Sequence, residues 1–291
     1  MTATVITVTH NSRDELAGML ESLSLLGEPA PEVICVDSGS DDDSRAVAAS
    51  HGAGVIELAG NPGYGAACNA GVEAAGGEIC ILLNPDTRLI DGGLQRLVRV
   101  AGRTRTILAP RLIDGARSLE QSAHPVPGGV GALLGAVVPP RLFPGRFRRR
   151  LEPSRATVPV EVGWAVGACL VASTGLLREL GPFDPGVFLY GEDMDLCLRA
   201  RELGASVVFR PDVTVIHAGG HSTAALGERQ RLEVQARRRR EVVLERLGPA
   251  ALSRDDRAQA LTFGLRALAG RRRSENIAKL GALRAAQKSP S

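Results

Sequence analysis

Residues 79–86 read Ile79-Cys80-Ile81-Leu82-Leu83-Asn84-Pro85-Asp86 and are the most informative segment for the fold. Its first five residues form a continuous apolar run of strand length, which is typical of a strand buried on both faces of a sheet. Asn84-Pro85-Asp86 then ends the run with turn residues. We therefore expect an interior strand over 79–83, with polar groups just beyond its carboxyl end.

Strands and helices alternate on the N-terminal side of this run. Strands are expected over 5–9, 33–36 and 55–58, and helices from the capping box Ser12-x-x-Glu15 to about 26, after Ser40 to about 50, and over 66–75. Strand–helix alternation at this spacing predicts an α/β fold, with a mostly parallel central sheet and helices on both of its faces. Ligands of such sheets bind beyond the carboxyl ends of the strands.

The C-terminal half is less regular. Residues 114–160 hold seven prolines and a basic cluster, Arg146 and Arg148–Arg150, and are expected to form a long irregular excursion. Beyond it we expect a strand over 168–172, helices over 174–180 and 192–203, and strands over 207–209 and 213–217. From 222 onward the pattern is helical, with one amphipathic face formed by Leu232, Ala236, Val243 and Leu247 and another helix beginning near Leu261.

The distribution of charge divides the chain near residue 222, where the helical pattern begins. Residues 221–291 hold 16 Lys and Arg against 7 Asp and Glu, although the whole chain of 291 residues carries a net charge of only +3. We therefore predict a domain over 1–225 and a basic helical extension over 226–291. Such an extension favours an anionic partner. The run Arg237–Arg240 fits a solvated helix face or an anionic membrane surface better than nucleic acid, with the acidic domain or a second subunit as alternative partners.

Composition excludes several classes of protein. Aromatic residues make up only 3% of the chain, which disfavours a base-stacking platform of the RNA-binding kind. The longest apolar stretch, 130–138, is too short to span a membrane, and the N-terminus lacks the features of a signal peptide. We therefore expect a cytoplasmic protein, peripheral at the inner face of the plasma membrane if the extension binds lipid. The five cysteines form no C-x-x-C pair and are expected to be buried thiols.

Three groups of residues could carry chemistry. Asp86 is placed to hold a divalent metal at a diphosphate, and a neutral His217 at another strand end could complete that site. Glu192 and Asp193 open a helix and could supply a general base. Each group also has a structural interpretation, as a turn aspartate, a strand-end histidine or helix-capping carboxylates. Asp41-Asp42-Asp43 is better explained as the N-terminal charge of a helix.

The order of these motifs resembles the family 2 glycosyltransferases, which have the GT-A fold, and within them the bacterial rhamnosyltransferase-like branch. The resemblance covers about 1–225. The stretches that carry it are Thr9-x-Asn11, Val36-Asp37-Ser38-Gly39-Ser40, Asn61-x-Gly63 to Asn69-x-Gly71, Leu83-Asn84-Pro85-Asp86, Gly181-Pro182-Phe183-Asp184, Phe188 to Arg199 with Glu192-Asp193-x-Asp195-Leu196, and His217-x-x-Gly220-x-Ser222.

The resemblance implies a role for each position. Asp86 and His217 would bind Mg²⁺ or Mn²⁺, Asp193 would be the catalytic base, and Glu192 would support it or bind the acceptor. Trp164 and Gly167 would line the acceptor side. The nucleotide-sugar would contact Thr9, Asn11, Asp37, Ser38, Asn61, Gly63, Asn69, Asn84 and Asp86.

Two departures from the family pattern bear on the donor. Asn84 replaces the first aspartate of the family's D-x-D motif, and Ser38 stands where many enzymes that use UDP-sugars carry a second aspartate. The resemblance thus favours inverting transfer of L-rhamnose from dTDP-rhamnose to a lipid-linked or polysaccharide acceptor in cell-envelope glycan synthesis. The alternatives are a UDP-sugar donor and a non-catalytic nucleotide-binding scaffold. A homodimer remains open, and no nucleic-acid partner is expected.

Overall fold

The computed structural model of the chain describes residues 1–129, 132, 135, 136, 138, 143–181, 183, 184, 187, 189–219, 227–270 and 272–288. Its strands are β1 (Ala3–Thr9), β2 (Glu32–Asp37), β3 (Gly54–Glu57), β4 (Ile79–Leu83), β5 (Thr87–Leu89), β6 (Thr106–Ile113), β7 (Ala123–His124), β8 (Val160–Glu161), β9 (Trp164–Ala165), β10 (Cys169–Ser173) and β11 (Ser206–His217). Its helices are α1 (Arg13–Ser22), η1 (Leu23–Leu26), α2 (Ser44–Ser50), α3 (Tyr64–Ala74), α4 (Leu94–Ala101), α6 (Gly145–Leu151), η3 (Pro153–Arg155), α7 (Thr174–Leu180), α8 (Glu192–Glu202), α9 (Glu228–Leu268) and α10 (Arg273–Lys288).

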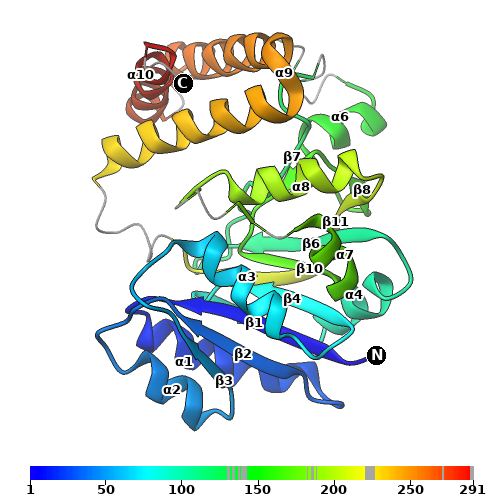
Figure 1. Cartoon of the computed structure of the whole chain (residues 1–291). Coiled ribbons are helices and arrows are strands. Elements are labelled where there is room, and N and C mark those ends of the chain that lie inside the picture. Colours follow the sequence, from blue (N-terminus) through cyan, green and yellow to red (C-terminus); the bar gives the residue numbers. More distant parts are fainter. Residues whose placement is uncertain are drawn as a thin grey trace.

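The central sheet of the described residues has the strand order β3-β2-β1-β4-β10-β6-β11-β5, with β8 paired to β11 (Figure 1). The strands β1 to β4 pair in parallel, as the strand–helix alternation predicts. The other half is mixed, because β10 runs antiparallel to both β4 and β6. This reversal has a consequence for the site. Ala168, which precedes β10, accepts a hydrogen bond from the backbone of Asn84 at the carboxyl end of β4.

Helices cover both faces of the sheet, as expected, and neighbouring strand residues point to opposite faces. On β1, Ile6 packs into the core formed with α3, α7 and α8, whereas Val5 packs into the core formed with α1, α2 and α4. Glycine permits the close approach of α3, since a Cβ at Gly71 would lie 2.4 Å from Cγ2 of Ile6.

Two predicted elements differ from the structure. The capping box at Ser12 does not form, because the Ser12 hydroxyl donates to the carbonyl of His10 instead of accepting from the helix, and α1 gives way to η1 at Leu23. The strands expected over 207–209 and 213–217 are one strand, β11, whose pairing with β6 is irregular between Arg210 and Thr214.

The described part of 114–160 contains short elements, which fits the expected irregular excursion. Its basic cluster lies on α6, a helix without buried residues. The apolar run expected over 130–138 lies mostly outside the described residues. The five cysteines are buried free thiols, as predicted, and burial raises the pKa of Cys35 to about 12.

Of the C-terminal helices, α9 packs against α8 of the α/β part, and α10 packs against α9 (Figure 1). Val242, Val243 and Ala251 of α9 form an apolar cluster with Met194 and Leu198 of α8. α9 is kinked at Gly248, which has a φ of 80° and is followed by Pro249, so it consists of two helical halves. Leu261, predicted to begin a separate helix, lies on the second half. The expected division at 225 falls within residues 220–226, outside the described part, and stays a prediction.

The kink determines where the arginines of the first half point. Arg239 forms a two-pronged ion pair with Asp255, and Arg240 pairs with Asp256, both carboxylates lying beyond Gly248. Arg237 and Arg238 pair with Glu241. The run Arg237–Arg240, which the sequence singled out for an anionic partner, is therefore engaged within α9 itself. Among the described helices, none combines the length and apolar character that crossing a membrane requires.

Candidate active site

The first cluster joins Asp86, His217 and Glu120. Asp86 lies in the turn between β4 and β5, and the pairing of β5 with β11 places His217 opposite Thr87. The backbone N–H of Ala218 also donates to the carbonyl of Asp86, at 2.9 Å. As a result Nε2 of His217 lies 3.5 Å from Oδ1 of Asp86, and its Nδ1 lies 3.1 Å from Oε2 of Glu120. The structure thus brings together the two residues predicted to bind metal.

Glu120 is a member of this cluster that the sequence analysis missed. It follows a turn that pairs Leu119 with Ile113 at the end of β6, so only the folded chain brings it to His217. Burial opposes a charged ring at His217, but the carboxylates of Asp86 and Glu120 outweigh it and raise the pKa of His217 to about 9. A carboxylate on the second ring nitrogen is the usual way in which proteins orient a histidine that binds metal.

The donor set fits a divalent cation that also binds a diphosphate. Oδ1 of Asp86 and Oδ1 of Asn84 are buried without a hydrogen-bond partner, so oxygen atoms stand available beside the imidazole. Within the described ranges, no group of three or more His, Cys, Asp or Glu side chains is arranged to hold a metal ion. A cation bound by Asp86 and His217 would have to complete its coordination with oxygens from substrate and water.

A second cluster lies at the ends of β1 and β2. Thr9 and Asp37 are register partners, and Oγ1 of Thr9 and Oδ1 of Asp37 are buried without a partner. Asn61 connects the next loop, because its Oδ1 accepts from the Ser38 hydroxyl and from the backbone of Gly63, both at 3.1 Å. This cluster therefore offers unpaired polar atoms in a loop framework that is already fixed.

Two other residues predicted to contact the nucleotide-sugar, Asn11 and Asn69, hold loops in place. Oδ1 of Asn11 accepts from the backbone of Asp41. The Asn69 side chain forms two hydrogen bonds of 2.7 Å with the backbone of Phe183, and so anchors the segment before α8. Asp42 accepts from the backbone N–H of Ser44 at the start of α2, as expected for a helix-terminal carboxylate.

The third cluster stands at the start of α8. Asp193 accepts from the backbone N–H of Met194 at 2.7 Å and from that of Gly167 at 3.1 Å. The Tyr64 hydroxyl donates to the carbonyl of the same Gly167. Burial raises the pKa of Asp193 well above its usual range, and burial together with Asp193 raises the pKa of Glu192. Oε2 of Glu192 is also buried without a partner.

Residues 167 and 168 connect this carboxylate pair to the first cluster. Gly167 donates to Asp193, and Ala168 accepts from Asn84, which lies two residues before Asp86. The two residues just before the antiparallel β10 thus link the predicted base to the predicted metal turn. Trp164 lies nearby on β9 and stacks on His124, with ring centroids 4.1 Å apart. Burial, followed by the charge of Arg239, lowers the pKa of His124 to about 3, so that ring is neutral.

The C-terminal extension supports α8 through Arg246, a contact between the basic extension and the acidic domain that the sequence analysis kept only as an alternative for Arg237–Arg240. Asp195 is buried and receives hydrogen bonds from Arg199 at 2.8 Å and from Arg246 of α9 at 2.6 Å. Gly191 lies against Val242 and Arg238 of α9, where a Cβ would be 3.4 to 3.5 Å from their side chains. The carboxylate pair is therefore held between β10 and α9.

Comparisons with known proteins agree with this geometry. Residues 4–151, about half of the chain, match the family Glycosyl transferase family 2. The N-acetylglucosaminyl-diphospho-decaprenol L-rhamnosyltransferase of Mycobacterium tuberculosis is 32% identical over 239 residues, which cover 75% of this chain and 76% of that protein.

Solved structures show the same fold at low identity. A mannosyltransferase from Pyrobaculum calidifontis, in complex with GDP-Man and Mn²⁺, is 18% identical with a TM-score of 0.62 and covers 98% of this chain and 85% of its own. Glucosyl-3-phosphoglycerate synthase from Mycobacterium tuberculosis, with Mn²⁺, UDP and phosphoglyceric acid, is 20% identical with a TM-score of 0.54 and covers 85% of this chain and 78% of its own. From the family match, the relative and the shared GT-A fold together, we conclude that this chain is a glycosyltransferase and belongs to family 2.

Proposed function

We propose that this enzyme transfers L-rhamnose from dTDP-rhamnose to a hydroxyl of a lipid-linked acceptor in cell-envelope glycan synthesis, with inversion at the anomeric carbon. The main structural support for this chemistry is a pair of hydrogen bonds at residues 167 and 168. They connect Asp193 to the turn that contains Asp86. The choice of sugar and acceptor is supported by the 32% identical mycobacterial rhamnosyltransferase.

The donor occupies the strand ends in this proposal. Thr9, Asp37, Ser38, Asn61 and Gly63 contact the nucleoside, and the unpaired oxygens of Thr9 and Asp37 are its first hydrogen-bonding partners. Asn11 and Asn69 contribute by fixing loops around it, as their hydrogen bonds to Asp41 and Phe183 indicate. Asn84 and Asp86 lie at the diphosphate.

Asp86 and His217 would hold Mg²⁺ or Mn²⁺, and Glu120 orients the His217 ring. When bound, the cation neutralises the negative charge that develops on the departing diphosphate. Asn84 stands where an aspartate would add a second charge, so the chain contributes one carboxylate from this turn.

Asp193 accepts the proton of the acceptor hydroxyl as that oxygen attacks the anomeric carbon from the face opposite the diphosphate. The two backbone N–H groups of Gly167 and Met194 hold the Asp193 carboxylate in place. Its raised pKa suits a group that takes up a proton near neutral pH. Glu192 supports the base or binds the acceptor, and Trp164 and Gly167 line the acceptor side.

A lipid-linked acceptor places the reaction at a membrane. We propose that the protein works at the inner face of the plasma membrane and that the basic helices of 226–291 attach it there, while 1–225 forms the catalytic domain. Attachment of this kind would bring Trp164 and Asp193 to an acceptor whose sugar end projects from the lipid.

A donor screen tests the proposal. With Mn²⁺ present, dTDP-rhamnose should raise the melting temperature by several degrees, whereas UDP- and GDP-sugars should not, because only a ligand that binds the folded state stabilises it. Equal or larger shifts with a UDP-sugar would favour the alternative donor. NMR of the product should show the anomeric configuration opposite to that of the donor, and retention would overturn the mechanism.

A further inference from the structure

The second half of α9 and α10 carry charges that the rest of the protein does not neutralise. Residues 249–288 contain three carboxylates, Asp255, Asp256 and Glu275, and each is already engaged in ion pairs. Five exposed cations of the same segment form no ion pair with any described residue: Arg257, Arg266, Arg273, Arg284 and Lys288. This is the reverse of the first half of α9, where the arginine run is paired.

The same two helices expose large apolar side chains. Leu261 and Leu265 are each 42% exposed, Leu268 is 86% exposed and Ile277 is 52% exposed. Exposed leucines gathered on one pair of helices are unusual for a surface that contacts water alone. Figure 1 shows α10 and this half of α9 at the end of the molecule opposite the β1–β3 edge of the sheet.

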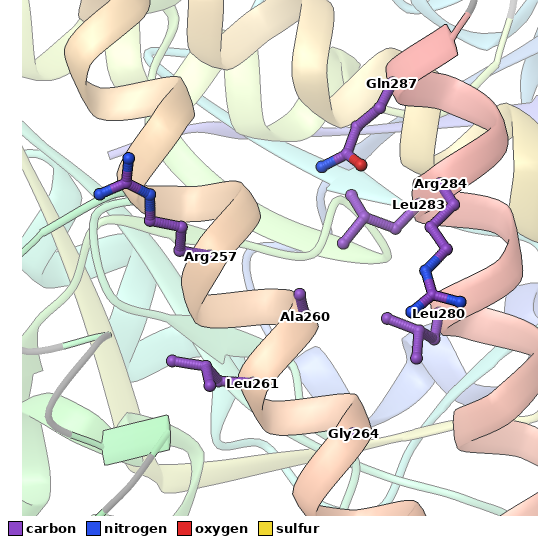
Figure 2. Close-up of a pocket in the computed structure, with 8 residues that line it drawn as sticks. All are labelled: Arg257, Ala260, Leu261, Gly264, Leu280, Leu283, Arg284 and Gln287. Atoms are coloured by element: carbon purple, nitrogen blue, oxygen red, sulfur yellow. The ribbon is translucent and has the colours of Figure 1, made fainter.

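A groove runs between the two helices, with a volume of about 640 Å³. Leu261 and Gly264 line it from α9, and Leu280 and Leu283 line it from α10, with Arg257 and Arg284 at its margins. In Figure 2 the side chains of Leu280 and Leu283 point across the groove toward α9. The groove therefore combines an apolar floor with cationic margins.

We propose that this α9–α10 face binds an anionic phospholipid surface, with the exposed leucines entering the lipid interface and the free arginines contacting headgroup phosphates. Helices that lie in a membrane interface combine these two features, an apolar side and a basic margin. Anionic lipid satisfies both at once. A second copy of the chain would cover the leucines but would bring identical arginines together, which costs free energy through like-charge repulsion.

This inference deepens the membrane attachment proposed above, because it narrows the attachment from the basic helices of 226–291 to the far half of α9 and to α10. It depends on the proposed function only for the reason why the protein would bind a membrane. Its test uses lipid vesicles without donor or acceptor, so that failure of lipid binding and failure of rhamnosyl transfer are separate results.

The experiment is co-sedimentation of the full-length protein with vesicles of phosphatidylglycerol or of neutral phosphatidylcholine. Deletion of the extension is unsuitable, because Val242, Val243 and Arg246 of α9 support α8. Point variants are used instead. The charge variant is Arg257→Glu with Arg284→Glu, and the apolar variant is Leu265→Ser with Leu268→Ser. The matched control is Arg99→Glu with Arg103→Glu, two exposed arginines at α4 that form no ion pair with described residues.

The wild type should bind phosphatidylglycerol vesicles at least tenfold more tightly than neutral ones, and the binding should fall steeply as salt rises from low to moderate concentration. The charge variant should lose at least tenfold in partition coefficient and the apolar variant several-fold, while the control stays within twofold and all melting temperatures match the wild type. Absent binding, equal binding to neutral vesicles, or variants that bind like the wild type would overturn the proposal. A concentration-dependent dimer that the apolar variant abolishes, without vesicle binding, would replace lipid with a second copy.

Discussion

The Asp86–Glu120–His217 cluster and the Glu192–Asp193 pair are both acidic and at least half-buried, yet they balance charge in opposite ways. In the first, two carboxylates hold one imidazole between them, and the ring's pKa rises to about 9. In the second, burial raises the pKa of both carboxylates, and the neighbouring charge of Asp193 adds to the rise at Glu192, although backbone N–H groups oppose it. The first arrangement favours a positive charge between its members, and the second favours a proton on its own carboxylates. The two clusters are therefore suited to different halves of one transfer reaction.

The largest effect should come from removing the proton acceptor. Asp193→Asn keeps the shape of the side chain but cannot take up a proton, so we expect kcat to fall by about 10²- to 10⁴-fold. Donor affinity, measured by calorimetry, should stay within a few-fold. The control is Glu202→Gln, an exposed carboxylate at the other end of α8, which should leave both quantities unchanged. A collapse in donor affinity would assign Asp193 to the nucleotide site instead.

The other cluster can be weakened without touching its predicted ligands. Chelation with EDTA should stop transfer, and Mg²⁺ or Mn²⁺ should restore it. Glu120→Gln removes the charge that orients His217, so the metal concentration for half-maximal rate should rise by about 10- to 100-fold, while kcat at saturating metal changes little. An unchanged metal requirement would mean that Glu120 plays no part, and full activity in EDTA would remove the metal from the mechanism.

Removing a contact between the extension and α8 should have a smaller effect, which should appear as a loss of stability. Arg246→Met keeps the length of the side chain but takes one charged hydrogen bond from buried Asp195, which retains Arg199. A lost hydrogen bond to a charged group costs about 1.5–3 kcal/mol, measurable as a lower free energy of unfolding in urea. Arg229→Met, at a side chain that is 91% exposed, should change it by less than about 0.5 kcal/mol. Equal effects would show that α9 does not brace α8.

The smallest expected effect is a pH dependence of stability that arises from Glu192. A raised pKa in the fold means that folded Glu192 holds its proton more tightly than the unfolded chain does, so stability is lost as pH rises above about 4, the unfolded value. Glu192→Gln avoids ionisation. Its free energy of unfolding should therefore exceed that of the wild type by about 1 kcal/mol or more at pH 7.5, and by almost nothing at pH 4.5. The same gain at both pH values would contradict a pKa origin.

The sequence predicted well which strand-end residues lie close together, because the carboxyl ends of parallel strands meet at one edge of a sheet. Thr9 and Asp37 are register partners, and β5 pairing with β11 brings His217 to Asp86. Glu120 could not be predicted in this way, because it arrives through a turn within an irregular segment. The reversed direction of β10 was also missed, since an apolar run carries no information about strand polarity.

The ion-pair partners of the arginine run could not be predicted from the sequence, for a related reason. Helical periodicity places Arg239 on a face of α9, but its partner Asp255 lies sixteen residues along, beyond a kink. A sequence pattern marks Gly248-Pro249 as a break without giving the direction in which the chain continues. The same limit applies to Arg246, which is 51 residues from Asp195. Contacts that depend on such long-range packing become visible only in the folded molecule.

The packing of α9 on α8 also has a consequence for the order of events during protein synthesis. The ribosome makes α8, with the two carboxylates proposed to act in catalysis, before it makes the helix that covers Met194 and Leu198 and binds Asp195. Until α9 follows, these apolar side chains face water and Asp195 has a single arginine. The α/β sheet can assemble early in translation, since folding proceeds from the N-terminus. The start of α8 should therefore reach its folded surroundings only late in translation, when α9 docks.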